Sequence, residues 1–373
     1  MVKVVKFNIY KYSLPLQSEF RISFSATSYT EGLIVEAFDE NGRKGYGESS
    51  PSSKIVGTTT DSALGIIRKI AGDILARDLS PWEAYKQISS SVIHNGDAKA
   101  AVEGAILDLY CQEINQPVYK CLGGYRDSFI TDMTIGIKSL DETLMDVQKY
   151  LEEGFTQLKI KVGEGPEKDV AKIKAIREKF GYDFVLRVDA NQGWTFKQAL
   201  KIAKEFEKYE IELIEQPLKY WDLRGIKALR NQTSIPIAVD ESVHTAIDAI
   251  NIIREDVADV INIKIMKAGG ILEGLRISLL SESAGIKNMI GCMLETRLGI
   301  TMAAHLVGLT ENIVYIDLDS DLSLRQDPVK GGVEHLGGGK RKIPNKPGFG
   351  VVIDKSQLQL VETIEQGRAS EYF

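Results

Sequence analysis

From about residue 130 onwards, short apolar runs alternate with amphipathic stretches of helical periodicity. Stretches such as EKDVAKIKAIREKFG and FKQALKIAKEFEKYE separate the runs, which recur about once every 25 residues. The runs lie at 132–138, 157–163, 184–190, 211–217, 235–241, 260–266, 287–293 and 312–319. Eight strand–helix repeats of this length predict an α/β fold, a parallel (β/α) barrel of the TIM type, with a short or displaced last helix.

The run at 157–163, QLKIKVG, has an unusual pattern for a buried strand. Leu158, Ile160 and Val162 alternate with Lys159 and Lys161. Alternate side chains of a strand point to the same face, so both lysines face either solvent or the interior of the barrel. A central barrel strand has no free edge, which favours the interior.

Residues 1–125 have a different texture from the barrel repeats. Strand patterns occur at 8–14, 32–38 and 42–48, and a long polar and aromatic loop is predicted at 15–31. Helical periodicity follows at 61–90 and 97–115. We therefore expect an α+β capping domain at 1–125, a barrel with the active site at 126–323, and a tail at 324–373 that returns to the barrel or the cap.

Three barrel runs end in carboxylates at the same relative position. Asp189, Glu215 and Asp240 close the third, fourth and fifth runs. The active site of such a barrel lies at the carboxyl ends of the strands, so these side chains would converge. Adjacent carboxylates stay ionised together only with a cation, and oxygen ligands suit Mg²⁺. The alternative for each residue alone is a cap of the following helix.

The second and sixth runs face each other across an eight-stranded barrel. They carry Lys161 and Lys264, which would then flank a bound ligand. Two bases on opposite sides of one carbon suit a 1,1-proton transfer that inverts a stereocentre. Lys159 would contact the substrate carboxylate, and nearby cations and burial would lower the lysine pKa values. Lys267 lies past its strand and is interpreted as a loop cation.

Composition and charge exclude several other classes of protein. The net charge of −6 leaves no basic footprint for nucleic acid. No apolar run approaches the length of a membrane span, and the N-terminal segment lacks the apolar core of a signal peptide. Cys111, Cys121 and Cys292 show no CxxC spacing, so neither a disulfide framework nor a zinc site is expected and a reducing cytoplasm is favoured.

At these residues the chain resembles the enolase superfamily, in its muconate-lactonising branch. The matching motifs run over almost the whole chain and are KIKVG, RVDANQGW, IEQPL, VDESV, NIKIMKAGG and PGFGV. The resemblance implies a barrel covered by a cap built from both termini. It also implies one Mg²⁺ on the three acids, with Lys161 and Lys264 as bases. Branches with a His base on the seventh strand are disfavoured, because no histidine ends that run.

The run at 312–319 carries a further clue in YIDLDSD. Its Asp317 and Asp319 resemble the acid pair with which dipeptide epimerases hold the α-ammonium group of the first residue. Paired acceptors suit a bound cation, whereas a polar loop at the barrel mouth is the alternative. Thr134, Cys292 and Leu294 match positions that contact the dipeptide in such enzymes.

The cap departs from one pattern of that group. Epimerases for Ala-Glu can carry an arginine in the first cap loop, where this chain has Ser25 beside Phe24. Ile55 lies in the second cap loop. Together these residues predict a pocket for an uncharged, hydrophobic second residue.

The leading hypothesis is an Mg²⁺-dependent epimerase of L-Ala-L/D-Xaa dipeptides. Alternatives within the branch are an o-succinylbenzoate synthase or N-acylamino acid racemase, an L-Ala-D/L-Glu epimerase and, more remotely, a muconate cycloisomerase. An inert barrel used for binding is the alternative from another class, and it would have no need of three metal acids and two opposed lysines. The resemblance also implies a homo-oligomer.

Overall fold

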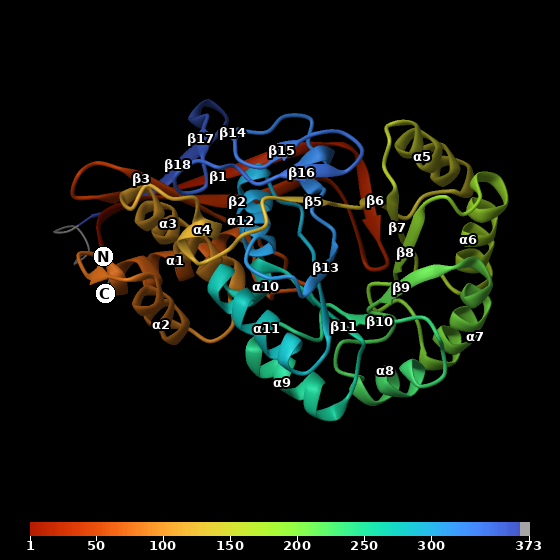
Figure 1. Ribbon diagram of the computed structural model, residues 1–373. Helices are drawn as coiled ribbons and strands as arrows, with labels where there is room; N and C mark the ends of the chain where they lie inside the picture. Colours follow the sequence, from red (N-terminus) through yellow and green to blue (C-terminus); the bar gives the residue numbers. More distant parts are fainter. Residues whose placement is uncertain (366–373) are drawn as a thin grey trace.

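The computed structural model describes residues 1–365. It contains a curved sheet of eight parallel strands that forms a barrel (Figure 1). The strands follow one another in chain order, each paired with the next. They are β6 (Met133–Ile135), β7 (Gln157–Lys161), β8 (Val185–Asp189), β9 (Ile211–Glu215), β10 (Ile237–Val239), β11 (Val260–Ile263), β12 (Lys287–Ile290) and β13 (Ile313–Ile316). The first and last strands meet where the Asp132 N–H donates to the Ile316 carbonyl at 3.0 Å. The predicted barrel fold is confirmed.

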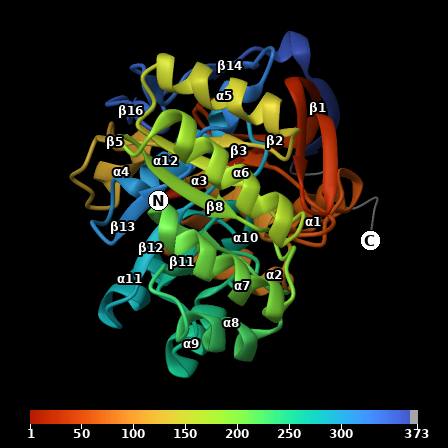
Figure 2. The ribbon, with the colours of Figure 1, turned by 90° about the vertical axis from the view of Figure 1, so that its right-hand side faces the viewer.

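Helices connect successive strands and cover the outside of the barrel (Figure 2). They are α5 (Leu140–Glu152), α6 (Pro166–Phe180), α7 (Phe196–Phe206), α8 (Leu223–Arg230), α9 (Ala246–Glu255), α10 (Ile265–Ala268), α11 (Ile271–Ser283) and α12 (Arg297–Val307), with the 3₁₀ turn η1 (Glu207–Tyr209). The last strand, β13, is followed directly by the 3₁₀ turn η2 (Ser320–Ser323) in place of a full helix. This agrees with the predicted short or displaced last helix. The apolar face of each strand, such as Leu158 and Ile160 of β7, packs against these helices, and Val162 directly after β7 joins the same core.

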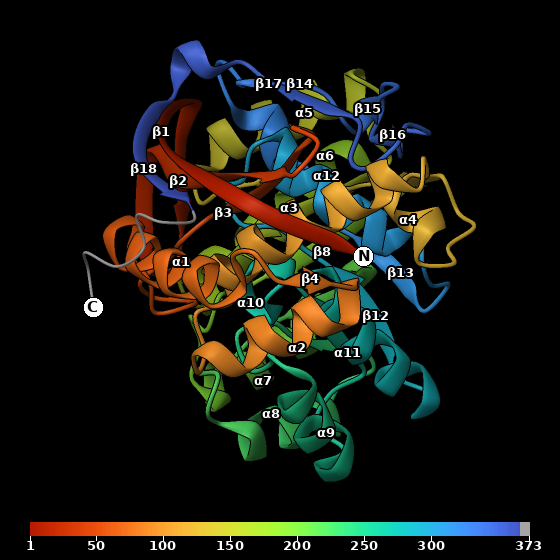
Figure 3. The same cartoon turned by 90° about the vertical axis from the view of Figure 1, so that its left-hand side faces the viewer.

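The cap is an antiparallel sheet with three helices on one face (Figure 3). Its elements are β1 (Val2–Ile22), β2 (Ser25–Asp39), β3 (Lys44–Ser49), β4 (Asp78–Leu79), α1 (Thr60–Ile74), α2 (Pro81–Ser91) and α3 (Gly96–Glu113). The tail returns to this sheet, because β18 (Gln359–Glu365) pairs with β1. Both ends of the described chain therefore contribute to the cap.

Smaller elements complete the described part of the chain. They are α4 (Val118–Cys121), β5 (Ser128–Ile130), β14 (Val329–Gly331), β15 (Glu334–His335), β16 (Lys340–Lys342), β17 (Val351–Ile353) and η3 (Lys355–Gln357). None of the helices in residues 1–365 combines the length and hydrophobicity that a bilayer crossing needs.

The predicted long loop at 15–31 is wrong. Strand β1 continues to Ile22 and β2 begins at Ser25, so the two strands form a long hairpin with its turn at Ser23 and Phe24. The register shifts between Pro15 and Phe20. This irregularity breaks the alternation of polar and apolar residues, which is why the sequence pattern suggested a loop.

Helix α3 lies between the cap sheet and the barrel and is buried along most of its length. Its Glu103 accepts hydrogen bonds from the N–H groups of Ile271 and Leu272, at 2.6 and 3.0 Å, at the start of α11. A side chain at Gly270 would place its Cβ 1.9 Å from the Glu103 carboxylate, and Gly270 has a φ of +127°. Glycine is therefore required where this carboxylate meets the helix start.

Glu103 is expected to make stability depend on pH. Burial raises its pKa from 4.5 to about 8, despite the two N–H donors. The folded protein thus holds a proton that the unfolded chain releases, so the contribution of Glu103 is fully present below pH 4.5 and is lost as the pH rises through 8. Glu103→Gln should reduce this loss of unfolding free energy at high pH. The reduction is a few kcal/mol at most, since one pKa unit corresponds to about 1.4 kcal/mol. Urea unfolding at pH 5 and 8.5 checks this, and parallel curves for the two proteins would contradict it.

Candidate active site

A cavity of about 490 Å³ opens between the cap and the carboxyl ends of the barrel strands. The barrel contributes the charged residues Lys159, Lys161, Lys264, Asp317 and Asp319 to its lining, and the cap contributes Glu31 and Lys54. Thr134, Cys292 and Leu294 line it from the barrel side. Phe24, Ser25 and Ile55 line it from the cap. The structure therefore brings together every predicted residue except the three metal acids, which lie deeper.

The predicted metal acids lie beneath the cavity floor. Asp189 and Glu215 are the last residues of β8 and β9 and are paired in register, and Asp240 follows β10 directly. All three side chains are fully buried. Lys161 is paired in register with Asp189. The acids thus share one level of the barrel, as their spacing predicted.

Each acid contacts a lysine that covers it. Lys161 Nζ lies 2.5 Å from Asp189, Lys159 Nζ lies 3.2 Å from Glu215, and Lys264 Nζ lies 2.8 Å from Asp240. The ligating oxygens of the acids do not all lie within 4.8 Å of one another, since the group of residues 1–365 that meets this distance is Cys292, Asp317 and Asp319.

The donor chemistry nevertheless fits a hard divalent cation. Three buried carboxylates converge from adjacent strands, and oxygen ligands of this kind are those that Mg²⁺ prefers. Neither Asp240 oxygen has a well-aligned hydrogen bond; both have only ammonium contacts. Some oxygens of Asp189 and Glu215, in contrast, accept a well-aligned hydrogen bond. The Asn262 side-chain amide, for example, donates to Glu215 at 2.6 Å.

The predicted lowering of the pKa of the base lysines is wrong for Lys264, and the pKa of the neighbouring Lys159 is raised as well. Burial alone would lower both, but the attraction of surrounding carboxylates outweighs burial and raises both pKa values. Asp240 and Glu215 act on Lys264, and Asp317 acts most strongly on Lys159. The folded site therefore buries more carboxylates around these lysines than the spacing of the strands indicated.

Lys267 is not the loop cation that its position suggested. It lies in the short helix α10 and is 2% exposed. Its ammonium group contacts Asp240 at 2.6 Å and donates to the carbonyls of Asp240, Val243 and Asn262. With Lys264 it holds the pKa of Asp240 below its usual range, against the effect of burial. Lys267 therefore pairs with Asp240 and does not line the cavity.

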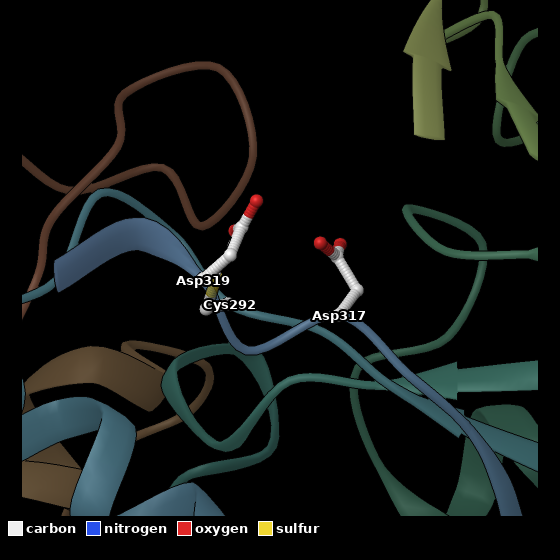
Figure 4. A group of neighbouring side chains, drawn as sticks. All are labelled: Cys292, Asp317 and Asp319. Atoms are coloured by element: carbon white, nitrogen blue, oxygen red, sulfur yellow. Dashed lines mark hydrogen bonds between the residues drawn. The ribbon is translucent and has the colours of Figure 1, made fainter. Parts of the chain in front are cut away.

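Asp317 and Asp319 follow β13 and point to the same side of the chain, with Cys292 beside Asp319 (Figure 4). Thr134 bridges the pair, because its N–H donates to Asp319 at 2.6 Å and its hydroxyl donates to Asp317 at 3.0 Å. Lys159 donates to Asp317 as well. This arrangement fixes both carboxylates at the cavity wall.

The pKa values of the two acids are shifted in opposite directions. Burial would raise the pKa of Asp317, but Lys159 and Lys161 hold it at about 2. Burial and the charge of Asp317 raise the pKa of Asp319 to about 6. Asp319 has no lysine or arginine within 4.0 Å in residues 1–365. A positively charged group of a ligand would supply the missing partner.

The cap closes the cavity with two segments that are tied to the barrel and to each other. The Ser23 hydroxyl donates to the Asn191 carbonyl at 2.7 Å, and the Ser50 hydroxyl donates to the Leu294 carbonyl at 3.2 Å. Lys54 joins the segments, because its ammonium donates to the Phe24 carbonyl at 2.7 Å and lies 5.5 Å from the Phe24 ring centre. Sequence reasoning missed Lys54, which sits beside Ile55 in the same segment.

Two family models match the chain, "Mandelate racemase / muconate lactonizing enzyme, N-terminal domain" at residues 5–123 and "Enolase C-terminal domain-like" at 142–357. An L-Ala-D/L-Glu epimerase of Bacillus subtilis (strain 168) is 38% identical over 356 residues, covering 94% of this chain and 97% of that protein. A hydrophobic dipeptide epimerase of Enterococcus faecalis V583 is 41% identical over 337 residues, covering 89% and 94%.

Solved structures give the same relationship. The crystal structure of a dipeptide epimerase from Enterococcus faecalis V583, complexed with Mg and L-Leu-L-Tyr, matches with a TM-score of 0.90 and 39% identity, covering 94% of this chain and 99% of that one. The chain therefore belongs to the mandelate racemase / muconate lactonizing enzyme family, and its relatives place it among the racemases and epimerases of that family.

Proposed function

We propose that the protein is a dipeptide epimerase that inverts the α-carbon of the second residue of L-Ala-L/D-Xaa dipeptides. The observation that carries this proposal is the joint presence, in one cavity, of the Asp317–Asp319 pair and of Lys161 and Lys264. The acid pair suits the α-ammonium group of a dipeptide. The named relatives, which are dipeptide epimerases, support the same activity.

In this proposal the two lysines act on opposite faces of the substrate α-carbon. Lys161 ends β7 and Lys264 follows β11, and β11 lies four positions after β7 in the barrel order, with three strands between them. One lysine, in its neutral form, takes the α-proton, and the other, as ammonium, gives a proton to the far face. The lysines exchange roles for the reverse reaction. Lys159 binds the substrate carboxylate and orients the α-carbon between them.

Asp189, Glu215 and Asp240 would hold one Mg²⁺. When bound there, the cation would stabilise the negative charge that develops on the substrate carboxylate as the α-proton leaves. The buried position of the acids keeps bulk water away from this charge.

Asp319→Asn is expected to raise KM for L-Ala-L-Xaa by roughly ten- to a hundredfold, because a charge-assisted hydrogen bond contributes about 1.5–3 kcal/mol. An N-succinyl amino acid lacks the ammonium group, so any turnover of such a substrate should be far less affected. Steady-state kinetics on both substrate types measure this. Equal losses on both would argue against an ammonium subsite and in favour of an N-acylamino acid racemase.

The second residue of the dipeptide is proposed to be uncharged, with hydrophobic side chains preferred. Phe24 and Ile55 offer apolar surface, Ser25 carries no charge, and Lys54 directs one of its three ammonium donors to the Phe24 carbonyl. A library of L-Ala-L-Xaa dipeptides in D₂O tests this through α-deuterium incorporation. Deuterium should enter hydrophobic Xaa faster than Glu or Asp, and exchange confined to acidic Xaa would exclude this pocket assignment in favour of an L-Ala-D/L-Glu epimerase.

We also propose a reducing cytoplasm as the compartment and a homo-oligomer as the assembly. Cys111, Cys121 and Cys292 are free thiols, which fits that compartment. Size-exclusion chromatography with light scattering measures the assembly.

A further inference from the structure

Glu241 is a buried carboxylate beside the metal acids that the proposed chemistry leaves without a role. It follows Asp240 directly and is 4% exposed. One of its oxygens accepts hydrogen bonds from the side-chain amides of Asn191, at 3.4 Å, and Gln192, at 3.2 Å. Its other oxygen, Oε2, has no hydrogen-bond partner within residues 1–365.

Glu241 differs from its three acidic neighbours in its lack of a cation. Asp189, Glu215 and Asp240 each have a lysine nitrogen within 3.2 Å. Across the described part of the chain, no lysine, arginine or histidine nitrogen lies within 4.0 Å of Glu241. Burying a carboxylate without a cation costs desolvation free energy. A cation bound nearby would offset this cost.

Asn191 presents a second buried acceptor without a partner. It is 3% exposed and lines the cavity, and its side-chain oxygen Oδ1 has no hydrogen-bond partner. The backbone around it is strained, because Asn191 and Gln192 have φ of +41° and +66°. The same turn lets the Asn191 N–H donate to Asp189 at 2.8 Å. The turn thus positions Asn191 against a metal acid and against Glu241 at once.

We propose that Glu241, together with Asn191, forms the outer shell of the cation site at Asp189, Glu215 and Asp240, accepting hydrogen bonds from water bound to the cation. This inference rests on the proposed function, which places the cation there. Two unpartnered acceptors match the protons of such water, and Mg²⁺ keeps several waters when protein ligands are few.

Cation binding to the full-length protein tests the inference without any measurement of activity. Titration calorimetry with Mg²⁺ and electron paramagnetic resonance with Mn²⁺ give the affinities. Glu241→Gln keeps the shape of the side chain and should weaken binding by about 10- to 100-fold, as is usual for outer-shell partners. Glu103→Gln is the matched control, because it also replaces a fully buried glutamate, but on α3, and should leave the affinity unchanged.

Thermal unfolding separates this role from a structural one. Without divalent cations, Glu241→Gln should unfold at the same or a higher temperature than the wild type, because an unpaired buried charge is removed; with Mg²⁺, its gain in Tm should be smaller. Glu241→Asp retains the charge, so it should bind the cation more tightly than Glu241→Gln.

Four results would overturn the inference. A lower Tm without cations combined with unchanged affinity in Glu241→Gln would make the residue structural. Weaker binding in Glu241→Asp than in Glu241→Gln would also exclude the role. A wild type that binds neither Mg²⁺ nor Mn²⁺ would remove both this inference and the metal site of the proposed function, whereas binding by the wild type and equally by Glu241→Gln would remove this inference alone.

Discussion

Replacing Lys264 with alanine is expected to reduce epimerisation by about 10³-fold or more, because a positioned acid or base contributes roughly 10²–10⁴-fold and both faces of the α-carbon need one. Lys161→Ala should lose as much, since inversion requires both lysines. The two variants should differ in D₂O. Each retains one lysine, so each can exchange the α-proton of one epimer only, and the two variants should exchange opposite epimers.

Two control variants make this result specific. Lys264→Arg keeps the positive charge next to Asp240 but does not release its proton, so it should be as inactive as the alanine variant. Lys172→Ala removes a buried lysine that is paired with Glu164 at 3.2 Å and does not line the cavity, so exchange should persist. Nuclear magnetic resonance of the α-proton signals of L-Ala-L-Xaa and L-Ala-D-Xaa measures all four variants. Exchange of both epimers by either alanine variant would contradict the two-base arrangement.

The barrel could be predicted from the sequence because its signal is repeated. Eight apolar runs at a constant spacing leave little choice of fold, and the level of Asp189, Glu215 and Asp240 follows from that spacing alone. The interior position of Lys159 and Lys161 also followed, since a strand without an edge has no solvent side. The residues that the repeat governs were therefore found.

The residues that were missed lie where the repeat ends. Lys267 stands past β11, where strand alternation no longer applies, and the short helix α10 turns it back toward Asp240. Glu241 likewise follows the end of β10 at Val239. The hairpin at 15–31 was hidden by a register shift near Pro15. In each case the side-chain direction depends on a local turn that periodicity does not encode.

The error in the lysine pKa values has a different origin. Sequence analysis placed five acids near the lysines, but the folded site also buries Asp132 and Glu241 close by. The sign of a buried lysine's pKa shift depends on this balance, because burial and attraction to carboxylates act in opposite directions. Counting charges along strands is insufficient where loops add further acids.

Removing divalent cations with a chelator is expected to stop α-proton exchange, by on the order of 10³-fold, since a metal contributes several kcal/mol to stabilising transition-state charge. Chelation is a cleaner test than substitution here. Asp240→Asn would leave Lys264 and Lys267 buried without their acid, and breaking a buried ion pair in this way costs about 3–5 kcal/mol. Loss of activity in that variant could then reflect unfolding. Exchange should return when Mg²⁺ is added to the chelated wild type.

The ion pairs give this prediction two further readouts. A cation at Asp189, Glu215 and Asp240 competes with the ammonium groups of the covering lysines for the same oxygens. Binding should therefore raise the free energy of unfolding, by roughly 2.7 kcal/mol at a hundred times Kd, visible as a higher Tm. It should also lower the pKa of Lys264, because the attraction of Asp240 and Glu215 that raises it is offset. The exchange rate rises with pH as the lysine becomes neutral. This rise should accordingly begin at lower pH as the Mg²⁺ concentration increases. A chelated protein that keeps its exchange rate, its Tm and its pH profile would show that these acids serve only to hold the lysines.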